Sequence, residues 1–400
     1  GHARYRLAPP AWWNPMGWLR RLAWPRVRPM LKSLQPSSGG YLEATPLTSF
    51  VTMALAAAGE AGHPCVADAV AFLERSMRED GSWPIDTDLA TWGTTLSVKS
   101  GVRVDDGEKA VITRWLLGQQ YREIHPFTNA APGGWAWTEL PGGVPDADDT
   151  AGALLALHAL GHGAEDAVPA ALRWLLDLQN RDGGIPTFCR GWGALPFDRS
   201  APELTAHALA AWWLWKSRIS DKKLKERIDA ATRRALRYLQ YVQQADGSWI
   251  PLWFGNESAR DEANPVYGTA QVVNYLCSVP ELAAQAEEML QRAGCFLLAA
   301  QGSDGSWGGE AGVAGSLEET GVAVQALAKL ESLGFLSVPV SAMDRAAGWL
   351  VSATRGGVVF PAAPVGLYFA RLWYHEELYP VVWSLGALKA LASRGAPCPV

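Results

Sequence analysis

Residues 238–249 read YLQYVQQADGSW, and this short pattern, more than any other in the chain, predicts the architecture. An aromatic–aliphatic pair, Tyr238-Leu239, is followed by Gln243 and then by a turn that ends in Gly-x-aromatic. Asp-Gly supplies a tight turn, because glycine adopts a left-handed backbone conformation without steric cost. The pattern returns almost unchanged in residues 296–307. We interpret each copy as the end of a helix and the turn that follows it.

Weaker copies run along the rest of the chain, at intervals of roughly 40 to 65 residues. They comprise Gln35 with Gly39-Gly40-Tyr41, Phe72-Leu73 with Gly81-Ser82-Trp83, Trp115-Leu116 with Gln120 and Gly133-Gly134-Trp135, Trp174-Leu175 with Gln179 and Gly183-Gly184-Ile185, and Trp349-Leu350 with Gly356-Gly357. Such repetition indicates stacked helical hairpins rather than separate domains. We expect each Gln and Trp to connect its repeat to the next by hydrogen bonding and stacking.

Helical patterns fill the segments between these turns, and strand-like alternation is nearly absent. The expected helices are 48–58, 64–78, 106–119, 165–178, 202–217, 222–244, 265–278, 281–300, 317–333 and 341–353. About six helical hairpins can close into a ring of inner and outer helices, which leaves no exposed end repeat. The sequence therefore predicts an all-α fold, an α/α barrel that forms a single domain over residues 39–400.

Composition narrows the range of functions. The formal charge is −5 and the pI is near 5.9, so no nucleic-acid partner is expected. Tryptophan is unusually frequent, with 20 residues, and an indole face can both pack and hold a cation. The cysteines are scattered without metal-ligand spacing, which favours reduced, mostly buried thiols and a cytoplasmic protein. They are Cys65, Cys189, Cys277, Cys295 and Cys398.

Residues 1–38 form a Trp-, Arg- and Pro-rich arm. Mixed Trp and Arg suit a membrane–water interface, yet five prolines, among them Pro25 and Pro29, are expected to prevent a long amphipathic helix. An arm packed on the body of the protein and a peripheral membrane contact both remain open. The chain has no apolar run long enough to span a bilayer.

The most reactive stretch is PDADDTA at residues 145–151. Three carboxylates this close cannot all ionise away from bulk water, so at least one is expected to keep its proton near neutral pH. A simpler interpretation is that Asp146 or Asp149 caps the helix that follows. Capping, however, needs only one of them.

A second polar group follows in residues 200–207, which read SAPELTAH. Ser200 and Glu203 fit a capping box, with a proline between them at the start of the helix. His207 lies four residues after Glu203 and therefore on the same helical face. A lone histidine on an apolar helix is usually a satisfied core residue, but beside an aspartate cluster it can stabilise the ionised carboxyls.

Together, the DADDTA stretch, the Gly-x-Trp repeats and ELTAH at residues 203–207 resemble squalene-hopene cyclases and, more widely, class II terpene cyclases, from about Gly39 to Pro380. The resemblance implies that Asp148 protonates a linear polyprenoid, which then cyclises through carbocations without a metal or redox cofactor. It further implies that Asp146 and Asp149 flank the donor and that His207 is its hydrogen-bonding partner. Glu203, where the family commonly has Asp, would orient His207.

The resemblance also implies an aromatic cavity that stabilises the cation and excludes water. Its expected substrate-binding residues are Trp92, Phe188, Trp192, Trp249, Trp253, Phe254, Tyr267, Phe360, Tyr368 and Phe369.

Two departures from the family bear on this expectation. Large members have two barrels with the cavity between them, whereas this chain has repeats enough for one. Where many relatives read Trp-Asp-Thr, this chain reads Trp92-Gly93-Thr94. Three explanations stay open: a homodimer or second barrel subunit completes the cavity, the chain is part of a longer enzyme, or the substrate is shorter than squalene, such as a shorter prenyl diphosphate.

Other functions fit the residues less well. A protein-prenyltransferase-like barrel needs zinc, and no cysteine has the Asp two residues before it that such a site normally shows, so no metal site is expected. A non-catalytic isoprenoid or lipid carrier would explain the aromatic residues but not the clustered carboxylates. A glycosidase would place its two carboxyls on different elements.

Overall fold

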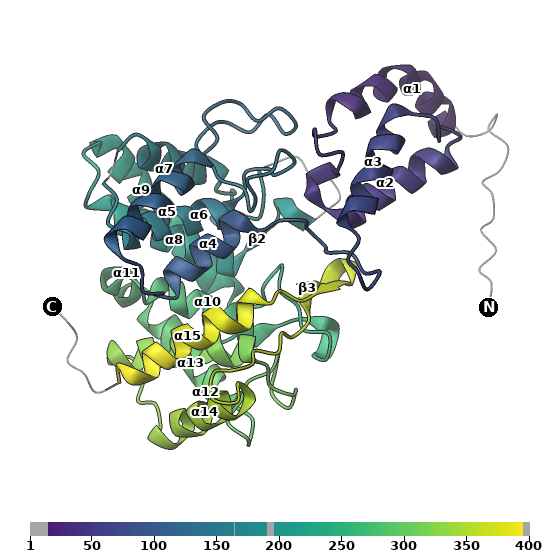
Figure 1. Ribbon diagram of the computed structural model, residues 1–400. Coiled ribbons are helices and arrows are strands. Elements are labelled where there is room, and N and C mark those ends of the chain that lie inside the picture. Colours follow the sequence, from purple (N-terminus) through teal and green to yellow (C-terminus); the bar gives the residue numbers. More distant parts are fainter. Residues whose placement is uncertain (1–14, 164, 190–195, 395–400) are drawn as a thin grey trace. The chain divides into compact units, whose positions relative to one another are not determined.

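A computed structural model of the chain describes residues 15–163, 165–189 and 196–394. The described residues form fifteen α-helices and four short strands, as Figure 1 shows, so the predicted all-α fold class is confirmed. The chain divides into two compact units. The first contains the described residues up to Asp88 together with Leu140–Gly143, and the second contains Leu89–Glu139 and the described residues from Val144 onward. The division into an arm of residues 1–38 and a barrel domain of residues 39–400 stays a prediction.

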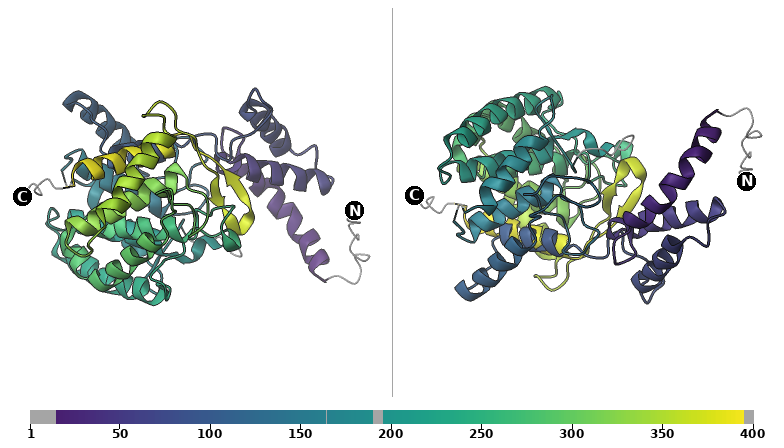
Figure 2. Two further views of the ribbon diagram at one scale, coloured as in Figure 1. Left: turned by 90° about the horizontal axis from the view of Figure 1, so that it is seen from below. Right: turned by 90° about the horizontal axis from the view of Figure 1, so that it is seen from above.

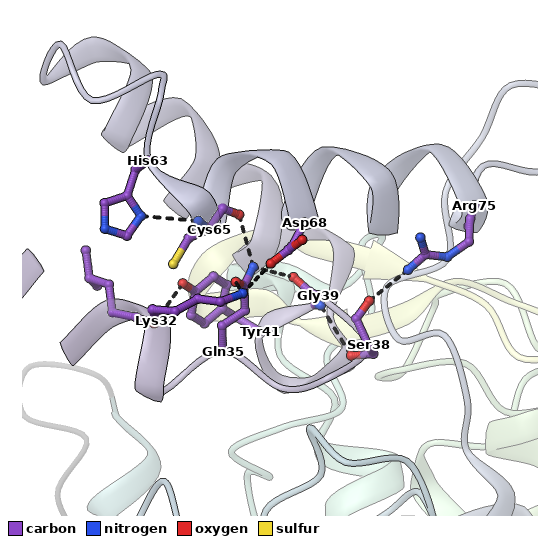
Figure 3. Close-up of polar contacts among 11 residues, drawn as sticks. Lys32, Gln35, Ser38, Gly39, Tyr41, His63, Cys65, Asp68 and Arg75 are labelled. Atoms are coloured by element: carbon purple, nitrogen blue, oxygen red, sulfur yellow. Dashed lines mark hydrogen bonds and ion pairs between the residues drawn. The ribbon is translucent and has the colours of Figure 1, made fainter. Parts of the chain in front are cut away.

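The first unit is a small helical bundle of α1 (Pro15–Ser33), α2 (Thr45–Ala57) and α3 (Pro64–Ser76). Helix α3 packs against both of the others. Its first repeat works as expected: Nε2 of Gln35 donates to the carbonyls of Gly39 and Cys65 at 2.9 and 3.0 Å, as Figure 3 shows. This side chain therefore joins the end of α1 to the start of α3.

The expectation that prolines prevent a long helix in the arm is wrong. Helix α1 runs for 19 residues with Pro25 and Pro29 inside it, and it is the continuous purple helix of Figure 2. Each proline removes one backbone hydrogen bond. Because most of α1 is exposed, water can satisfy the carbonyls that the prolines leave without a partner.

The second unit contains a closed ring of six inner helices. In chain order they are α4 (Ala90–Lys99), α6 (Ala147–Ala159), α8 (Pro202–Lys216), α10 (Pro265–Leu276), α13 (Leu317–Ser332) and α15 (Leu378–Ala392). Each packs against the next, and α15 returns to α4. Figure 1 shows α13 and α15 side by side. The inner helices are buried on most of their surfaces, as the center of such a ring requires.

The outer helices are α5 (Asp106–Gly118), α7 (Ala167–Leu178), α9 (Lys222–Val242), α12 (Glu287–Ala299) and α14 (Val340–Ala353), with the short α11 (Pro280–Ala284) before α12. The single helix expected over residues 281–300 is therefore interrupted. Two inner helices, α4 and α15, were not among those expected from the sequence. Helix α4 is rich in Thr and Gly, and α15 is apolar nearly all round with Pro380 and Gly386, so neither has a clear amphipathic period.

The glutamines of the repeats join successive outer helices as predicted, whereas the expected hydrogen bond from each tryptophan to the next repeat is wrong. Nε2 of Gln243 donates to the carbonyls of Gly247 and Met289, both at 2.9 Å, and Gln301 bonds Gly305 and Ala342 in the same way. The indole of the following tryptophan turns back to its own helix, as when Trp249 Nε1 donates to the Leu239 carbonyl at 2.9 Å. Gln120 and Gln179 repeat the arrangement.

Short strands order the loops that precede the inner helices. Strand β1 (Ile185–Pro186) pairs with β2 (Ser200–Ala201), and β3 (Val365–Leu367) pairs with β4 (Leu372–Tyr374), both antiparallel. Single bridges connect Asp146 to Trp135 and to Phe188. These contacts fix the backbone just before the acidic start of α6.

Two further observations concern the expectations from composition. Cys65, Cys189, Cys277 and Cys295 form no disulfide with one another, and all but Cys295 are buried, whereas Cys398 lies outside the described residues. Within the part of the chain that the structure describes, no helix is both long enough and apolar enough to cross a membrane.

Candidate active site

The acidic stretch begins helix α6. Asp146 is its N-cap residue: Oδ1 accepts a hydrogen bond from the backbone N–H of Asp149 at 2.7 Å. The capping interpretation therefore holds for Asp146. Its other oxygen, Oδ2, and Oδ1 of Asp149 are both buried and have no hydrogen-bonding partner among the described residues. Two carboxyls in such surroundings disfavour the ionised form.

Asp148 points elsewhere. Its Oδ1 lies 2.5 Å from Nδ1 of His207 on α8, so the structure brings these two residues together as the resemblance implied. The His207 side chain is fully buried, whereas 22% of the Asp148 side chain is exposed. Of the three aspartates, Asp148 is thus the one that combines a histidine partner with a surface that another molecule can reach.

A lysine that the sequence analysis did not single out completes this group. Nζ of Lys99, the last residue of α4, lies 3.2 Å from Nε2 of His207. It also lies 5.4 Å from the ring centroid of Trp92 and 5.5 Å from that of Tyr275. The His207 imidazole stacks on Tyr275, with 4.0 Å between centroids and 13° between planes. Lys99 is the only charged residue of α4. A single charge in this otherwise uncharged segment was the feature of the sequence that could have pointed to it.

Burial dominates the electrostatics of the site. It raises the pKa of Asp149 to about 8, and the Asp148 charge adds to the effect, while hydrogen bonding with the Asp146 side chain and the Lys99 charge oppose it. It raises the pKa of Asp146 well above the usual range, and the charge of Asp149 raises it further. The expectation that at least one carboxyl keeps its proton near neutral pH agrees with these shifts.

The two basic groups respond in the opposite direction. Burial lowers the pKa of Lys99 to about 8, while the nearby Asp148 and Asp149 charges oppose the change. Burial, together with the Lys99 charge, lowers the pKa of His207 to about 4. A carboxylate 2.5 Å away would by itself raise the pKa of the imidazole, but desolvation and Lys99 outweigh it. At neutral pH the ring is uncharged and Lys99 is the main cation.

Glu203 does not take the roles expected of it. The N-cap of α8 is Ala201, without a side-chain hydrogen bond, and Ser200 Oγ instead donates to Asp182, so the capping box is wrong. Oε1 of Glu203 accepts from the backbone N–H of Leu252 at 3.1 Å. Both ring nitrogens of His207 already have other partners, so Glu203 does not orient the ring. Burial raises the pKa of Glu203 to about 8.

Aromatic side chains form two groups in the second unit. In the first, Phe188 lies 5.7 Å from Trp253, and Tyr368 and Phe369 are 6.1 Å apart, all between ring centroids. Phe197 links the two pairs, at 5.1 Å from Phe188 and 5.8 Å from Phe369. Four of these five residues were expected from the sequence, and Phe197 was not.

The second group lies around Tyr267. Phe254 is 4.6 Å from Tyr267, and Trp383 is 5.8 Å from it. Tyr379 stacks near Trp383, and its hydroxyl accepts a hydrogen bond from Nε1 of Trp92 at 2.8 Å. Tyr379 and Trp383 were missed because they belong to α15, a helix that the sequence analysis did not expect.

Three expected substrate-binding residues do not join these groups. Trp249 is fully buried and serves the repeat contact described above. Phe360 is half-buried and has no ring contact among the described residues. Trp192 lies outside the described residues.

Comparison with known proteins shows a match to one protein-family model. The model described as squalene-hopene cyclase C-terminal domain matches residues 86–328. An enfumafungin synthase of Hormonema carpetanum is 28% identical over 336 residues, which is 75% of this chain and 24% of the relative. A drimenyl diphosphate synthase of Streptomyces showdoensis is 27% identical over 330 residues, which is 81% of this chain and 54% of the relative. The chain thus spans between a quarter and about half of these curated relatives.

Solved structures agree about the fold. An ent-copalyl diphosphate synthase from Streptomyces platensis superimposes with a TM-score of 0.57 at 24% sequence identity, covering 82% of this chain and 55% of that one. The likeness supports the α/α ring predicted from the repeats and seen in the closed circle of inner helices.

Proposed function

The chain belongs to the squalene-hopene cyclase C-terminal domain family, a family of class II terpene cyclases, and we propose on this basis that it cyclises a linear polyprenoid by protonating a terminal double bond. The observation that carries the proposal is the pairing of Asp148 with His207. A carboxyl that is partly exposed on one side and hydrogen-bonded to a buried imidazole on the other can release a proton into a site and leave a stabilised anion behind.

The chemical step needs no further reactant. The O–H bond of the Asp148 carboxyl breaks, and its electron pair stays on the carboxylate oxygen. The π electrons of the substrate double bond form the new C–H bond, which leaves a tertiary carbocation on the neighbouring carbon. The next double bond of the chain then attacks this cation, which closes a ring and moves the positive charge to a further carbon, until the last cation loses a proton or is captured by water. Asp146 and Asp149 flank the donor, and their burial keeps the surroundings poor in competing charge.

The two aromatic groups suit the cation that follows. The face of a Trp, Tyr or Phe ring attracts a cation within about 6 Å, with up to about 2 kcal/mol when water is excluded. Phe188, Trp253 and Phe369 in one group, and Phe254 and Tyr267 in the other, offer such faces. We propose these residues, with Trp92 and Tyr368, as substrate contacts.

We propose a linear isoprenoid as the substrate class, either squalene or a shorter chain that carries a diphosphate. The names of the two compared diphosphate synthases favour the shorter chain, since these proteins match over more than four-fifths of this one. The relatives are longer than this chain, so a second copy or a further barrel is proposed to complete the enclosure. Helix α1, with exposed Trp18 and Leu22 beside several arginines, is proposed as a peripheral membrane contact.

The decisive experiment replaces Asp148 with Asn. We expect Asp148→Asn to abolish turnover without unfolding the protein, because the amide cannot supply the proton. The measurement is product analysis by gas chromatography and mass spectrometry after incubation with squalene, geranylgeranyl diphosphate and farnesyl diphosphate. Asp106→Asn is the matched control, since that carboxylate lies on outer helix α5 with 98% of its side chain exposed.

The outcomes separate the two function classes. Cyclic product from the wild-type and Asp106→Asn proteins, and none from Asp148→Asn, supports the cyclase. Unchanged product from Asp148→Asn contradicts the assignment of the acid. Saturable binding of a prenyl chain by the wild-type protein, with no new product from any substrate, favours a non-catalytic isoprenoid carrier.

A further inference from the structure

Lys99 has an orientation that its position on α4 does not require. A lysine in the last turn of a helix usually stays near the helix C-terminus, where it complements the helix dipole. Lys99 instead reaches the imidazole of His207 on α8, a residue 108 positions away in the chain. The faces of Trp92 and Tyr275 lie on either side of its path at 5.4 and 5.5 Å. Three elements thus hold the ammonium against one ring nitrogen.

The chemistry of the ammonium fixes the direction of this hydrogen bond. A protonated lysine has three N–H donors and no acceptor, so Nε2 of His207 must present its lone pair. A neutral imidazole carries its one proton on the other nitrogen, which is Nδ1. That nitrogen lies 2.5 Å from Oδ1 of Asp148, and the N–H therefore donates to the carboxyl.

We propose that Lys99 is a positioning residue that holds His207 in the tautomer whose Nδ1–H donates to Asp148. The effect of Lys99 on catalysis rests on the proposed function, whereas the tautomer of His207 can be measured without any substrate. Lys99 contacts the reaction only through the imidazole.

The tautomer matters because it decides where the Asp148 proton can go. With Nδ1–H as donor, the imidazole stabilises the carboxylate that forms and cannot accept the carboxyl proton. The proton on the other oxygen is then available to an alkene. In the opposite tautomer, the bare Nδ1 would accept a hydrogen bond from the carboxyl O–H and withdraw the proton from the substrate side. Burial of His207 matters for the same reason, because only an uncharged imidazole has one bare nitrogen and therefore a choice of tautomer.

The titratable groups in direct contact with the His207 ring come from three packed helices. Lys99 comes from α4, Asp148 from α6 and Tyr275 from α10, which stacks on the ring face. Two further groups act on Lys99 through their charges: Asp149 raises its pKa and Lys329 lowers it. Because several groups influence the His207 ring, the test of Lys99 must replace Lys99 itself and compare the tautomer before and after.

The test reads the tautomer directly. The full chain is labelled with ¹⁵N-histidine, and long-range ¹H–¹⁵N NMR distinguishes a protonated ring nitrogen from a bare one. The His207 signals are those missing from His207→Gln. We expect wild-type protein at pH 7 to show a protonated Nδ1 and a bare Nε2. We expect Lys99→Met to move the proton, wholly or in part, to Nε2, and Lys99→Arg, which also has donors only, to keep the wild-type pattern.

Lys329→Met is the matched control. Lys329 is another buried lysine of the ring, on α13, and its Nζ donates to the Asn274 carbonyl at 2.9 Å rather than to His207. Its charge lowers the pKa of Lys99, so its removal deletes a buried cation, favours protonated Lys99 and should leave the His207 tautomer at pH 7 unchanged. Circular dichroism and thermal unfolding check that each variant is folded; replacing a buried charge by an apolar side chain of similar volume is often neutral for stability.

A titration of the wild-type protein gives a second measurement that needs no variant. Because burial lowers the pKa of Lys99 to about 8, the ammonium loses its proton above that pH and its amine can accept from Nε2–H. The Nδ1–H population of His207 should fall with a midpoint near pH 8. A wild-type ring protonated on Nε2 at pH 7, or a Lys99→Met ring with the wild-type pattern, overturns the proposal.

Activity supplies the link to catalysis. We expect Lys99→Met to lower kcat by roughly 100-fold, the order seen when one stabilising donor is removed, with KM nearly unchanged. Lys99→Arg should recover a substantial part of that loss. If Lys99→Met moves the His207 proton to Nε2 but leaves kcat unchanged, the tautomer proposal stands and only the effect of Lys99 on catalysis is overturned. Absence of product from the wild-type protein would overturn the proposed function and leave the tautomer result standing.

Discussion

At the scale of single residues, the site shows how strongly burial changes side chains that look alike in the sequence. Asp146, Asp148 and Asp149 lie within four positions, yet one caps a helix, one meets a histidine and one has an Oδ1 with no partner among the described residues. The difference comes from the direction in which the first turn of α6 points each carboxyl. The same local chemistry therefore provides a structural group and a candidate proton donor side by side.

Glu203 gives a prediction about stability at this scale. Its pKa is about 8 in the folded protein, against about 4.3 for a free Glu. Between these values the folded state holds one more proton than the unfolded state, so the free energy of unfolding falls as pH rises from about 4.3 to about 8. We expect Glu203→Gln to be more stable than wild type at pH 8 by on the order of 3 kcal/mol, and close to it at pH 5.

Urea unfolding at pH 5, 6.5 and 8 measures this difference. Glu288→Gln, on the exposed face of α12, is the control and should follow the wild-type curve at every pH. Parallel curves for wild type and Glu203→Gln would show that the Glu203 carboxyl is already ionised throughout this range.

At the scale of elements, the repeat turns connect one outer helix to the next through a very close backbone approach. Gly247 has a φ of +94°, and a Cβ on it would lie 2.5 Å from the carbonyl oxygen of Arg292 on α12. Arg292 in turn donates to Oε1 of Gln243, so the turn, the glutamine and the neighbouring helix form one contact. Glycine is required here for both conformation and space.

Gly247→Ala tests the turn against a matched position. Gly312 has a similar φ of +84°, but a Cβ there would meet nothing within 4 Å. We expect Gly312→Ala to cost about 1 kcal/mol from backbone strain and Gly247→Ala to cost about 1–3 kcal/mol more, because the neighbouring helix must move. Denaturant midpoints at constant m measure both changes. Equal losses would mean that the approach to Arg292 is not tight in solution.

Helix α1 carries a second prediction at this scale. It has no acidic residue, and Trp18, Leu22 and Met30 are 62%, 58% and 58% exposed. If this helix contacts a membrane surface, anionic vesicles should bind the protein more strongly than neutral ones, since each basic residue near the surface contributes about 1 kcal/mol. The variant Trp18→Ala/Leu22→Ala should reduce co-sedimentation at least tenfold. Tyr241→Ala removes an 89% exposed aromatic side chain from α9 and should leave co-sedimentation unchanged. An equal loss of co-sedimentation in the α1 double variant and in Tyr241→Ala would contradict a role for α1.

At the scale of the whole molecule, the inner ring is closed while the enclosure of a substrate stays a proposal. A carbocation must be kept from water until the last ring forms. Because the matched relatives are about one and a half to three times as long as this chain, we expect cyclisation to require a second copy of this chain or a further barrel.

Sedimentation velocity and activity over a dilution series test this expectation. If a second copy completes the site, specific activity should fall as the dimer dissociates. Activity that appears only when another barrel protein is added would support the second arrangement. A monomer that cyclises its substrate at an undiminished rate after dilution would contradict both.

The sequence by itself determined the repeated architecture and the position of the acidic stretch. In the clearest repeats the Gln bonds a carbonyl four residues on and one on the next hairpin, and the Trp bonds a carbonyl ten residues back, so a regular spacing is enough to predict that these residues serve the turn. The same holds for Asp146 as an N-cap, because capping is decided by three neighbouring residues. Patterns failed for the inner helices α4 and α15, because their polar and apolar residues are not separated onto opposite faces and so give no helical period.

Only the tertiary structure decided which side chains meet at the site. Asp148 and His207 are 59 positions apart, and Lys99 is 108 positions from His207. Spacing within each helix fixes the face that a residue occupies, but ring closure fixes which faces meet and how far a lysine must reach. For the same reason the sequence favoured Glu203 as the partner of His207, one turn away on α8, whereas packing turned Glu203 toward the Leu252 backbone and brought Lys99 to the ring from another helix.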